Sequence, residues 1–600
     1  MAGQKPTSSV ARRARRHTAE VRQQNQRPTT YEFSNEQSAA RCRSVGLCES
    51  AQLSCSVADR VASDRTVRDC ALSNTTTPSA RAEAIRHAIS SSFAAYRACA
   101  WGADELAPLH CNGAKTAGLG LGLVSSLPFL RLLGLDDHWQ AGAAWVAEQD
   151  WSGPLVNETD LIADTYASTK FGLGPLMSAY AMSGKSVSRQ TRQAFLQRAN
   201  ELGSMLLPAV ADSASEFPLR MINRTTGQPM LHARLGNETT PGDVAAVVLE
   251  WTLLSRFTGN RRFEQDAHAM LAALMEEGAE HKGLVRGKVN TSTGEFTGLH
   301  YVIGSETVEY YDTLLKLWIL LGKRDASLKH APVRQTMVRV SARKLWYVGE
   351  VTVSDGRQWT KMQHAACALP GLLMLARAHG LDTRVAGADR NSPAGASDLR
   401  LARELMQACY EGHRSMPTGL APARWHWLAT VPDGNPRGVA HFVVNSGDGA
   451  ADLGPETASS LYLLWKTTGD ARYRDWAWML FRTLQRWARA ERGECRGARC
   501  KRLKGEAAGY LAVGDVQKVP PVTRDAQPAR VLATLSYLWL TQADRAEGCT
   551  GDACRLGLRQ ARAGAEDRSI VRLKDHVFVA EGYPLPLASS RIVRGASVKA

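Results

Sequence analysis

The sequence predicts an all-α fold made of about seven helical hairpins, either closed into a toroid or stacked as a solenoid. Three observations favour this fold: apolar residues recur with the period of a helix, strand-like alternation is scarce, and short breaks end one apolar segment after another. The chain has 600 residues, of which 44% are hydrophobic, and this composition excludes a mainly disordered or fibrous protein. Its mean hydropathy is −0.26, and no apolar run is long enough to predict a membrane-spanning helix.

The helical period is clear in residues 195–206, where apolar residues fall at i, i+4, i+7 and i+11, and in residues 476–487, where they fall at i, i+4, i+8 and i+11. Each spacing gives its helix one apolar face. Glycine readily adopts the left-handed conformation that ends a helix, so glycine-containing breaks predict the corners of helical hairpins. These breaks lie at Gly134, Gly184, Gly259, Gly322, Gly380 and Gly469, and a seventh, without glycine, lies near Gln542. Their unequal spacing predicts hairpins joined by loops of varying length.

Three regions follow from these patterns. Residues 1–84 form a basic, cysteine-containing leader, which we expect to be flexible because its first thirty residues carry many arginines and no aromatic side chain. Residues 85–590 carry the helical pattern, and residues 591–600 form a C-terminal tail.

The net charge of +16 is concentrated in the leader and in residues 482–504. Such a cluster could bind nucleic acid through phosphate contacts, or it could be the solvated face of a helix that continues into a basic loop. No helix-turn-helix, zinc-finger or RNA-binding motif is present, so we predict no specific nucleic-acid partner. A basic face could instead bind an acidic protein partner.

The 12 cysteines lack the short CxxC and histidine spacings of a zinc site, so we expect disulfides and an oxidising compartment. Five Asn-x-Ser/Thr triplets are compatible with glycosylation in that compartment. They lie at Asn74, Asn157, Asn223, Asn237 and Asn290. The N-terminus, by contrast, has no apolar segment typical of a signal peptide. The body of the chain therefore indicates the secretory pathway, whereas its first residues do not.

Ten motifs follow one another between Ala94 and Pro586, among them AWGADELAPL (100–109), YASTKFGLGPLMSAY (166–180), GPETASSLYLLWKTTGD (454–470) and VFVAEGYPLPL (577–587). In content and order they resemble glycoside hydrolase family 47, the class I α-1,2-mannosidases and the related endoplasmic reticulum degradation-enhancing mannosidase-like proteins. The resemblance implies an (αα)7 barrel, a disulfide between Cys367 and Cys409, and a place in the lumen of the endoplasmic reticulum or Golgi. It also implies a high-mannose glycan or glycoprotein as partner.

The chemistry that the resemblance implies is inverting hydrolysis of an α-1,2-linked mannose. One carboxylic acid protonates the leaving oxygen, and one carboxylate activates water on the opposite face of the sugar. The family also holds a calcium ion at the barrel floor, where a threonine binds it directly and carboxylates hold its water shell.

This chain departs from that pattern at the decisive positions. The acid-bearing glutamate of the family motif FETTIR is Ala167, the catalytic aspartate is Val308, and the calcium-binding threonine is Ala580. Because the threonine and its acidic shell are lost together, the sequence indicates that calcium binding is abandoned rather than rearranged.

Glu456 survives in GPETASS, as a residual base or as a carboxylate that favours the N-terminus of a helix. Asp164 and Glu309 are the nearest substitutes for the lost carboxylates, but Asp164 is displaced by about a helical turn, roughly 5 Å. His364 either touches the substrate or is a structural histidine, and Glu581 either binds a sugar hydroxyl or is a solvated loop residue.

The sequence thus predicts a class I α-1,2-mannosidase-like protein of N-glycan processing or glycoprotein quality control, with impaired catalysis, that acts as a glycan- or glycoprotein-binding or scaffold module. One alternative is an active calcium-dependent mannosidase that trims high-mannose N-glycans with Glu456 and either Asp164 or Glu309. The other is a structural or interaction protein that uses its basic face.

Overall fold

The computed structural model describes residues 72–587 with gaps. The gaps are 73, 153–160, 212, 282, 323–336, 382–383, 385–386, 429–441, 491–495, 497–508 and 547–571. The chain divides into two compact units, residues 1–53 and 54–600, and all described residues belong to the second. Most of the predicted leader, the tail 591–600, Asn157, most of the basic cluster after Ala490, and eight of the cysteines lie outside the described residues. Those cysteines are Cys42, Cys48, Cys55, Cys70, Cys495, Cys500, Cys549 and Cys554.

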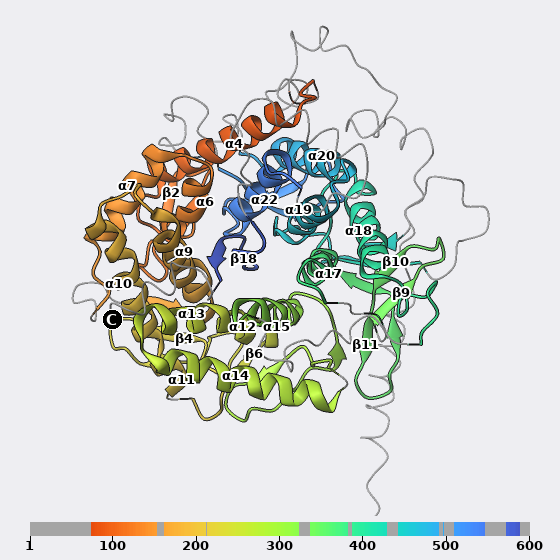
Figure 1. Ribbon diagram of the computed structural model, residues 1–600, viewed down its shortest axis with the longest axis horizontal. Helices are drawn as coiled ribbons and strands as arrows, with labels where there is room; N and C mark the ends of the chain where they lie inside the picture. Colours follow the sequence, from red (N-terminus) through yellow and green to blue (C-terminus); the bar gives the residue numbers. More distant parts are fainter. Residues whose placement is uncertain are drawn as a thin grey trace, which may run out of the picture. The chain divides into compact units, whose positions relative to one another are not determined.

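The helices form a ring of two layers (Figure 1). The inner layer contains, within the described ranges, α6 (Leu127–Leu132), α9 (Gly174–Ser183), α13 (Val248–Thr258), α15 (Val308–Leu320), α17 (Leu369–Ala378), α19 (Glu456–Thr468) and α22 (Val531–Ala543). The outer layer contains α4 (Pro78–Cys99), α7 (Asp136–Glu148), α10 (Arg189–Leu206), α14 (Arg261–Glu280), α18 (Asp398–Arg414) and α20 (Arg472–Trp487). The last inner helix, α22, contacts both α4 and α6, and this contact closes the ring.

The burial of each helix follows from its layer. The inner helix α22 buries twelve of its side chains, because it lies between the outer layer and the centre of the ring. The outer helix α10 buries the predicted stripe from Phe195 to Leu206 and exposes its other face. An all-α barrel is therefore confirmed, in the closed rather than the stacked form.

The six glycine corners are confirmed as well. All six glycines have positive φ angles, between 51° and 84°, which side chains other than glycine rarely adopt. Gly259 and Gly469 follow α13 and α19 directly. The seventh break also fits, since α22 ends at Ala543.

Short helices and short antiparallel strands connect the two layers. The helices are α5 (Leu121–Val124), α8 (Thr165–Ser168), the π-helix η2 (Thr169–Leu173), α11 (Pro208–Ala211), α12 (Pro241–Ala246) and the 3-10 helix η4 (His364–Ala368). The strands before the C-terminal hairpin are β1 (Glu105–Ala107), β2 (Asn112–Ala114), β3 (Ile162–Asp164), β4 (Met221–Asn223), β5 (Pro229–Met230), β6 (Glu238–Thr239), β7 (Val289–Asn290), β8 (His300–Tyr301), β9 (Val338–Val340), β10 (Trp346–Val348), β11 (Glu350–Thr352), β12 (Gln358–Trp359), β13 (Lys361–Gln363), β14 (Arg424–Trp427), β15 (Phe442–Val443), β16 (Ala512–Asp515) and β17 (Val522–Arg524). Their sheets have two or three strands each. Within the described ranges, no helix combines the length and the apolarity needed to cross a bilayer.

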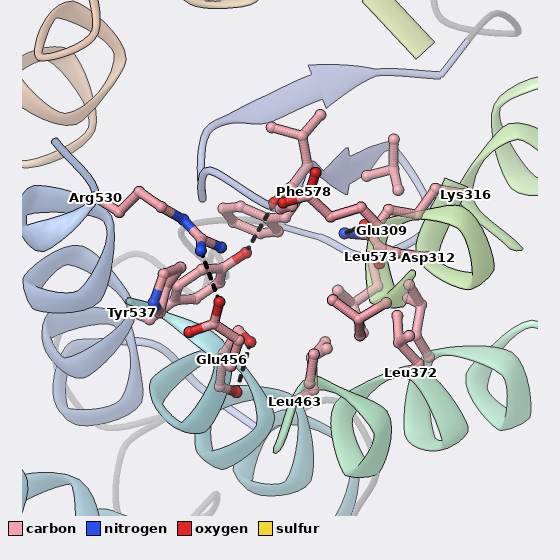
Figure 2. A pocket seen from close by; sticks show the side chains of 18 of the residues that line it. Glu309, Asp312, Lys316, Leu372, Glu456, Leu463, Arg530, Tyr537, Leu573 and Phe578 are labelled. Carbon is pink, nitrogen blue, oxygen red and sulfur yellow. Dashed lines mark hydrogen bonds and ion pairs between the residues drawn. The ribbon is translucent and has the colours of Figure 1, made fainter. Parts of the chain in front are cut away.

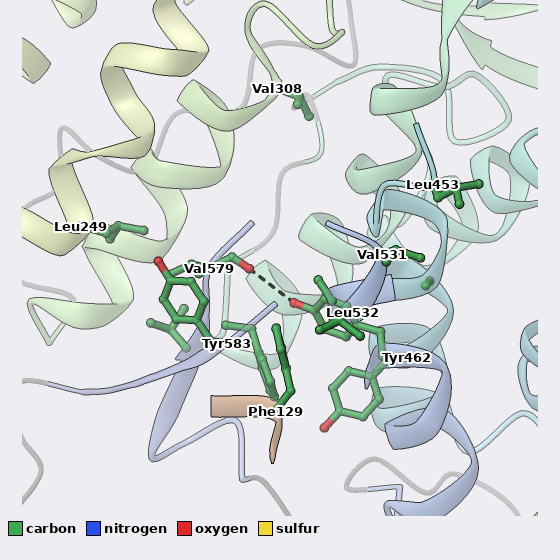
Figure 3. Close-up of a cluster of buried hydrophobic side chains, with 14 of the residues drawn as sticks. Phe129, Leu249, Val308, Leu453, Tyr462, Val531, Leu532, Val579 and Tyr583 are labelled. Atoms are coloured by element: carbon green, nitrogen blue, oxygen red, sulfur yellow. Dashed lines mark hydrogen bonds between the residues drawn. The ribbon is translucent and has the colours of Figure 1, made fainter. Parts of the chain in front are cut away.

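A C-terminal hairpin fills the centre of the ring. It consists of β18 (His576–Phe578) paired antiparallel with β19 (Pro584–Pro586), and it contacts α15 on one side and α9 on the other. Val579 and Tyr583 of this hairpin lie among apolar side chains of the inner helices (Figure 3). Tyr583 packs so closely on α9 that a Cβ atom at Gly174 would lie 1.9 Å from its hydroxyl oxygen.

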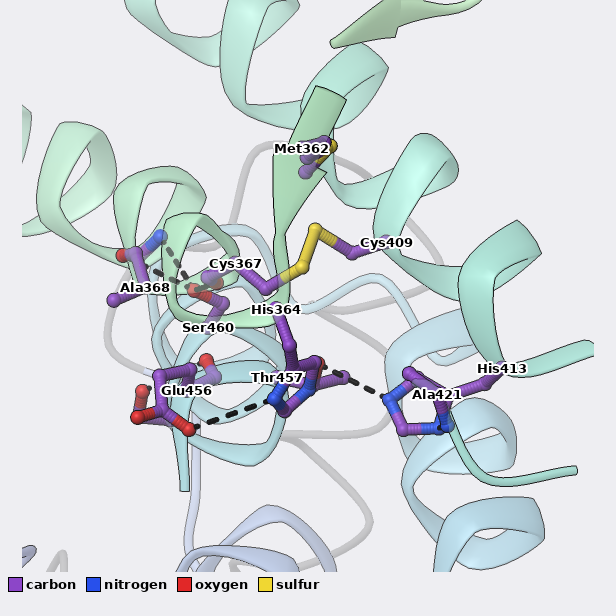
Figure 4. The surroundings of a disulfide bond; sticks show 12 residues. Met362, His364, Cys367, Ala368, Cys409, His413, Ala421, Glu456, Thr457 and Ser460 are labelled. Atoms are coloured by element: carbon purple, nitrogen blue, oxygen red, sulfur yellow. Dashed lines mark hydrogen bonds and ion pairs between the residues drawn. A yellow bond between two sulfur atoms is a disulfide. The ribbon is translucent and has the colours of Figure 1, made fainter. Parts of the chain in front are cut away.

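Two disulfides join described residues. Cys367–Cys409 links η4 to α18, as the resemblance implies, and Cys99–Cys111 links the end of α4 to the loop that follows it. The first of them holds His364 of η4 close to His413 of α18 (Figure 4).

Candidate functional site

A small cavity lies beside the C-terminal hairpin, between α15, α17, α19 and α22 (Figure 2). Its volume is about 40 Å³, which is room for a few water molecules. Two of the substituted positions, Val308 and Ala580, line it. Its charged and polar lining consists of Glu309, Asp312, Lys316, Glu456, Ser459, Arg530, Tyr537 and His576.

Glu456, the surviving carboxylate, is the first residue of α19 and is buried. Its Oε1 lies 2.7 Å from Nη1 of Arg530, and its Oε2 lies 3.8 Å from Nδ1 of His364. Burial alone would lower the pKa of Arg530, but Glu456 and the other nearby carboxylates outweigh it and raise that pKa. The guanidinium therefore stays charged, and Glu456 is held in an ion pair.

A hydrogen-bonded chain runs from His413 of α18 through Thr457 to His364, which lies beside Glu456. Thr457 Oγ1 lies 2.9 Å from Nε2 of His364 and 3.2 Å from Nε2 of His413. The backbone N–H of Ala421 donates to Nδ1 of His413 at 3.0 Å. Because an amide N–H can only donate, Nδ1 of His413 is the acceptor and carries no proton. The carbonyl oxygen of Gly419, 3.3 Å from Nδ1, therefore forms no hydrogen bond with it in this tautomer.

This assignment fixes the protons along the chain. Burial lowers the pKa of His413 to about 3, so His413 is neutral. With its proton on Nε2, His413 donates to Oγ1 of Thr457, which also forms a hydrogen bond with Nε2 of His364. The other ring nitrogen of His364, Nδ1, is the atom that faces Glu456 (Figure 4).

A second charged cluster surrounds Lys170 of the π-helix η2. Its ammonium forms a hydrogen bond with Glu309 and lies 3.6 Å from Oδ1 of Asp243 and 3.9 Å from Oε1 of Glu581. Burial disfavours the charged form, but Glu309, Glu581 and Asp243 outweigh it and raise the pKa of Lys170. The side chain is therefore a buried cation with three carboxylate neighbours from three elements.

Asp164 has a structural role in this arrangement. Its Oδ1 accepts the backbone N–H groups of Tyr166 and Ala167 at 3.0 and 2.9 Å, which caps the N-terminus of α8. Its Oδ2 lies 2.7 Å from Nε of Arg220, whose Nη1 lies 2.8 Å from Asp243. Asp164 is thus tied to backbone and to arginine.

One buried carboxyl group beside the hairpin carries a proton at neutral pH. Glu250 of α13 accepts a hydrogen bond from the hydroxyl of Tyr583 at 2.8 Å. Burial, and then the charge of Glu581, raise the pKa of Glu250 to about 8. Burial and the charge of Glu309 raise the pKa of Glu581 to about 7.

These residues do not fit a calcium ion. Calcium takes six to eight oxygen ligands, but Ala580 offers no side-chain oxygen at the position of the family's threonine. Glu309 and Glu581 already share the ammonium of Lys170, and the charged Arg530 stands near both of them.

The structure brings most of the predicted site residues together in two groups. His364 lies beside Glu456, which is paired with Arg530, and Glu309 and Glu581 meet at Lys170. Asp164 lies apart and is linked to Lys170 only through Arg220 and Asp243.

Two cations of the site, Lys170 and Arg530, were not predicted from the sequence. Lys170 is the one charged residue of the stretch 165–184, and such a lone charge in a helical stretch is a signal for a buried ion pair. Arg530 directly precedes the apolar helix α22, where an arginine is ordinary, so it gives no such signal.

Comparisons with known proteins agree with this architecture. A family model described as Glycosyl hydrolase family 47 matches residues 88–587. The human endoplasmic reticulum mannosyl-oligosaccharide 1,2-alpha-mannosidase is 32% identical over 503 residues, which cover 82% of this chain and 62% of that protein. The Arabidopsis thaliana mannosyl-oligosaccharide 1,2-alpha-mannosidase MNS3 is 28% identical over 549 residues, which cover 85% of this chain and 79% of that protein.

This chain therefore spans somewhat less than two thirds of the length of its human relative. Among solved structures, the alpha-1,2-mannosidase from Trichoderma reesei superimposes with a TM-score of 0.67 at 19% identity, over 86% of this chain and all of that one. At this identity the superposition establishes the shared (αα)7 barrel.

Proposed function

Because this chain belongs to glycosyl hydrolase family 47, we propose that it keeps the family's barrel as a glycan- or glycoprotein-binding or scaffold module and has lost efficient hydrolysis. On this proposal it acts in N-glycan processing or glycoprotein quality control in the lumen of the secretory pathway. One observation carries the proposal: each carboxylate that could replace the lost ones is already paired. Glu456 is bound to Arg530, Glu309 to Lys170 and Asp164 to Arg220.

The chemistry explains why these pairs matter. An inverting glycosidase needs a protonated carboxyl group on one side of the glycosidic bond and a free carboxylate, with its water, on the other. The hydrocarbon side chains of Ala167 and Val308 offer neither an acidic proton nor a lone pair. The cavity beside Val308 has a volume of about 40 Å³ and is lined by Leu372, Leu463 and Phe578 as well as by charges.

An active calcium-dependent mannosidase that trims high-mannose N-glycans remains the second candidate. The observation that favours it is the approach of His364 to Glu456, since an ordered imidazole beside a carboxylate is a common arrangement for a general base. In that case Glu456 would activate water, and Glu309 would have to leave Lys170 to act as the acid.

The third candidate is the interaction protein that binds an acidic partner through its basic face. Most of the cluster 482–504 lies outside the described residues, so this candidate depends on the sequence alone. Binding that weakens steeply with salt would support it.

The deciding experiment incubates the purified full chain with a defined high-mannose oligosaccharide, in the presence of calcium, and measures both binding and free mannose. We expect binding of the glycan or glycoprotein without mannose release above background, and the same background for Glu456→Gln. Mannose release at ordinary enzyme rates that Glu456→Gln abolishes would overturn the proposal in favour of the active enzyme.

A further inference from the structure

We propose that the ammonium group of Lys170 is a built-in cation that takes the electrostatic place of the family's calcium at the barrel floor. As a result, the barrel of this chain is stable without a divalent metal. The inference does not rest on the proposed loss of hydrolysis, because it concerns folding and metal binding in the absence of any glycan.

The first support is the position of the ammonium. Nζ of Lys170 contacts Glu309 of α15 and lies within 4 Å of Asp243 of α12 and Glu581 of the hairpin turn. Glu581 directly follows Ala580, the residue at the position of the family's calcium-binding threonine. The cation therefore lies beside the carboxylate of the residue that directly follows the family's calcium-binding position.

The second support is the charge balance. Glu309, Asp243 and Glu581 come from three different elements and would repel one another on a buried floor without a cation between them. Arg220 neutralises part of the charge of Asp243, and Arg530 adds positive potential near Glu309 and Glu581. A dication placed here would face these fixed positive charges at short range, so the site is unfavourable for calcium.

The third support is the local backbone. Residues 169–173 form a π-helix between α8 and α9. A π-helix inserts an extra residue into a turn and thereby changes the direction of the side chains that follow, and such turns are frequent at functional sites. Here the irregular turn carries Lys170, whose side chain is buried although it belongs to one of the most strongly hydrated residue types.

The experiment compares the wild-type chain with Lys170→Met and with a matched control, Lys316→Met. Lys316 is also a buried lysine of the same region, but it pairs with a single carboxylate, Asp312, at 2.6 Å. Thermal melting is measured with EGTA and with millimolar calcium, and metal binding is followed by terbium luminescence excited through tryptophan.

We expect the wild-type melting temperature to be the same with EGTA and with calcium, and terbium binding at this floor to be absent. Lys170→Met should melt several degrees lower in EGTA, recover part of that loss with calcium, and bind terbium at least about tenfold more tightly than wild type. Lys316→Met should melt lower without a response to calcium.

Three outcomes would overturn the proposal: a wild-type chain stabilised by calcium, a Lys170→Met variant as stable as wild type, or a calcium response in Lys316→Met equal to that in Lys170→Met. If Lys170→Met fails to fold, the double variant Lys170→Met/Glu581→Gln, which removes one unpaired carboxylate, should restore folding. A double variant that also fails to fold would count against a role in charge balance.

Discussion

Removal of the Cys367–Cys409 disulfide should destabilise the protein more than removal of Cys99–Cys111. The first bond joins residues 42 apart in the chain, and the second joins residues 12 apart. A cross-link lowers the entropy of the unfolded chain by an amount that grows with the logarithm of the loop it closes. At 25 °C the longer loop corresponds to about 4 kcal/mol and the shorter one to about 3 kcal/mol.

The stabilities of the two variants can be compared directly because the four cysteines have similar surroundings. All four cysteines are buried, so replacement of each pair by alanines leaves similar small gaps, and the difference between the two variants reflects the loops. The assay is urea unfolding of the full chain, followed by tryptophan fluorescence, for Cys367→Ala/Cys409→Ala and Cys99→Ala/Cys111→Ala. We expect both midpoints to fall and the first to fall further. A Cys99→Ala/Cys111→Ala variant that loses as much stability as the other, or more, would refute the reasoning from loop length.

Three further predictions follow from buried contacts. Thr457→Val should lower the free energy of unfolding by about 1–3 kcal/mol, because it leaves the Nε2 proton of His413 without an acceptor. Thr457→Ser keeps the hydroxyl and should lower it much less. Equal losses for the two variants in urea unfolding would contradict the proton assignment. For Glu250, the folded-state pKa of about 8 exceeds the ordinary value of 4.5. Between these two pH values the native state therefore binds a proton that the unfolded chain has lost. As a result, the free energy of unfolding falls as pH rises, by at most about 1.4 kcal/mol per pH unit. Glu250→Gln should reduce this slope between pH 5 and 8, and an unchanged slope would show that the group does not titrate as described. Gly174→Ala should lower the free energy of unfolding by more than about 1–3 kcal/mol, because its Cβ would lie 1.9 Å from the hydroxyl oxygen of Tyr583. In the control, Gly287→Ala, the Cβ would lie 3.4 Å from the nearest atom. The control should therefore unfold at a higher urea concentration than Gly174→Ala.

The fold could be predicted from the sequence because its determinants are local. Each corner glycine, such as Gly259 or Gly469, ends a helix through its own backbone conformation. Likewise, the apolar stripe of residues 195–206 marks the buried face of α10 without reference to any other segment. Closure of the ring was harder to predict, because it depends on contacts between α22 and α4, which lie at opposite ends of the described chain.

The candidate site could be predicted only in part, for the same physical reason. Motif comparison located Glu456 and Glu581, and it identified the substituted positions. The partners of these carboxylates, Lys170 and Arg530, come from distant segments of the chain. Motifs and residue spacing indicate neither the distance between such partners nor the burial of their side chains. Whether a carboxylate is free or ion-paired therefore became visible only in three dimensions.

The order in which the ring is completed has a consequence for synthesis. The hairpin that occupies the middle of the ring and the helix that seals it, α22, both belong to the last part of the described chain. While the ribosome is still producing that part, the earlier inner helices have no partner on their central side, and their apolar faces are open to solvent. A premature stop before residue 531 would therefore remove the helix that closes the ring and would leave the apolar faces of α4 and α19 that pack against it exposed to solvent.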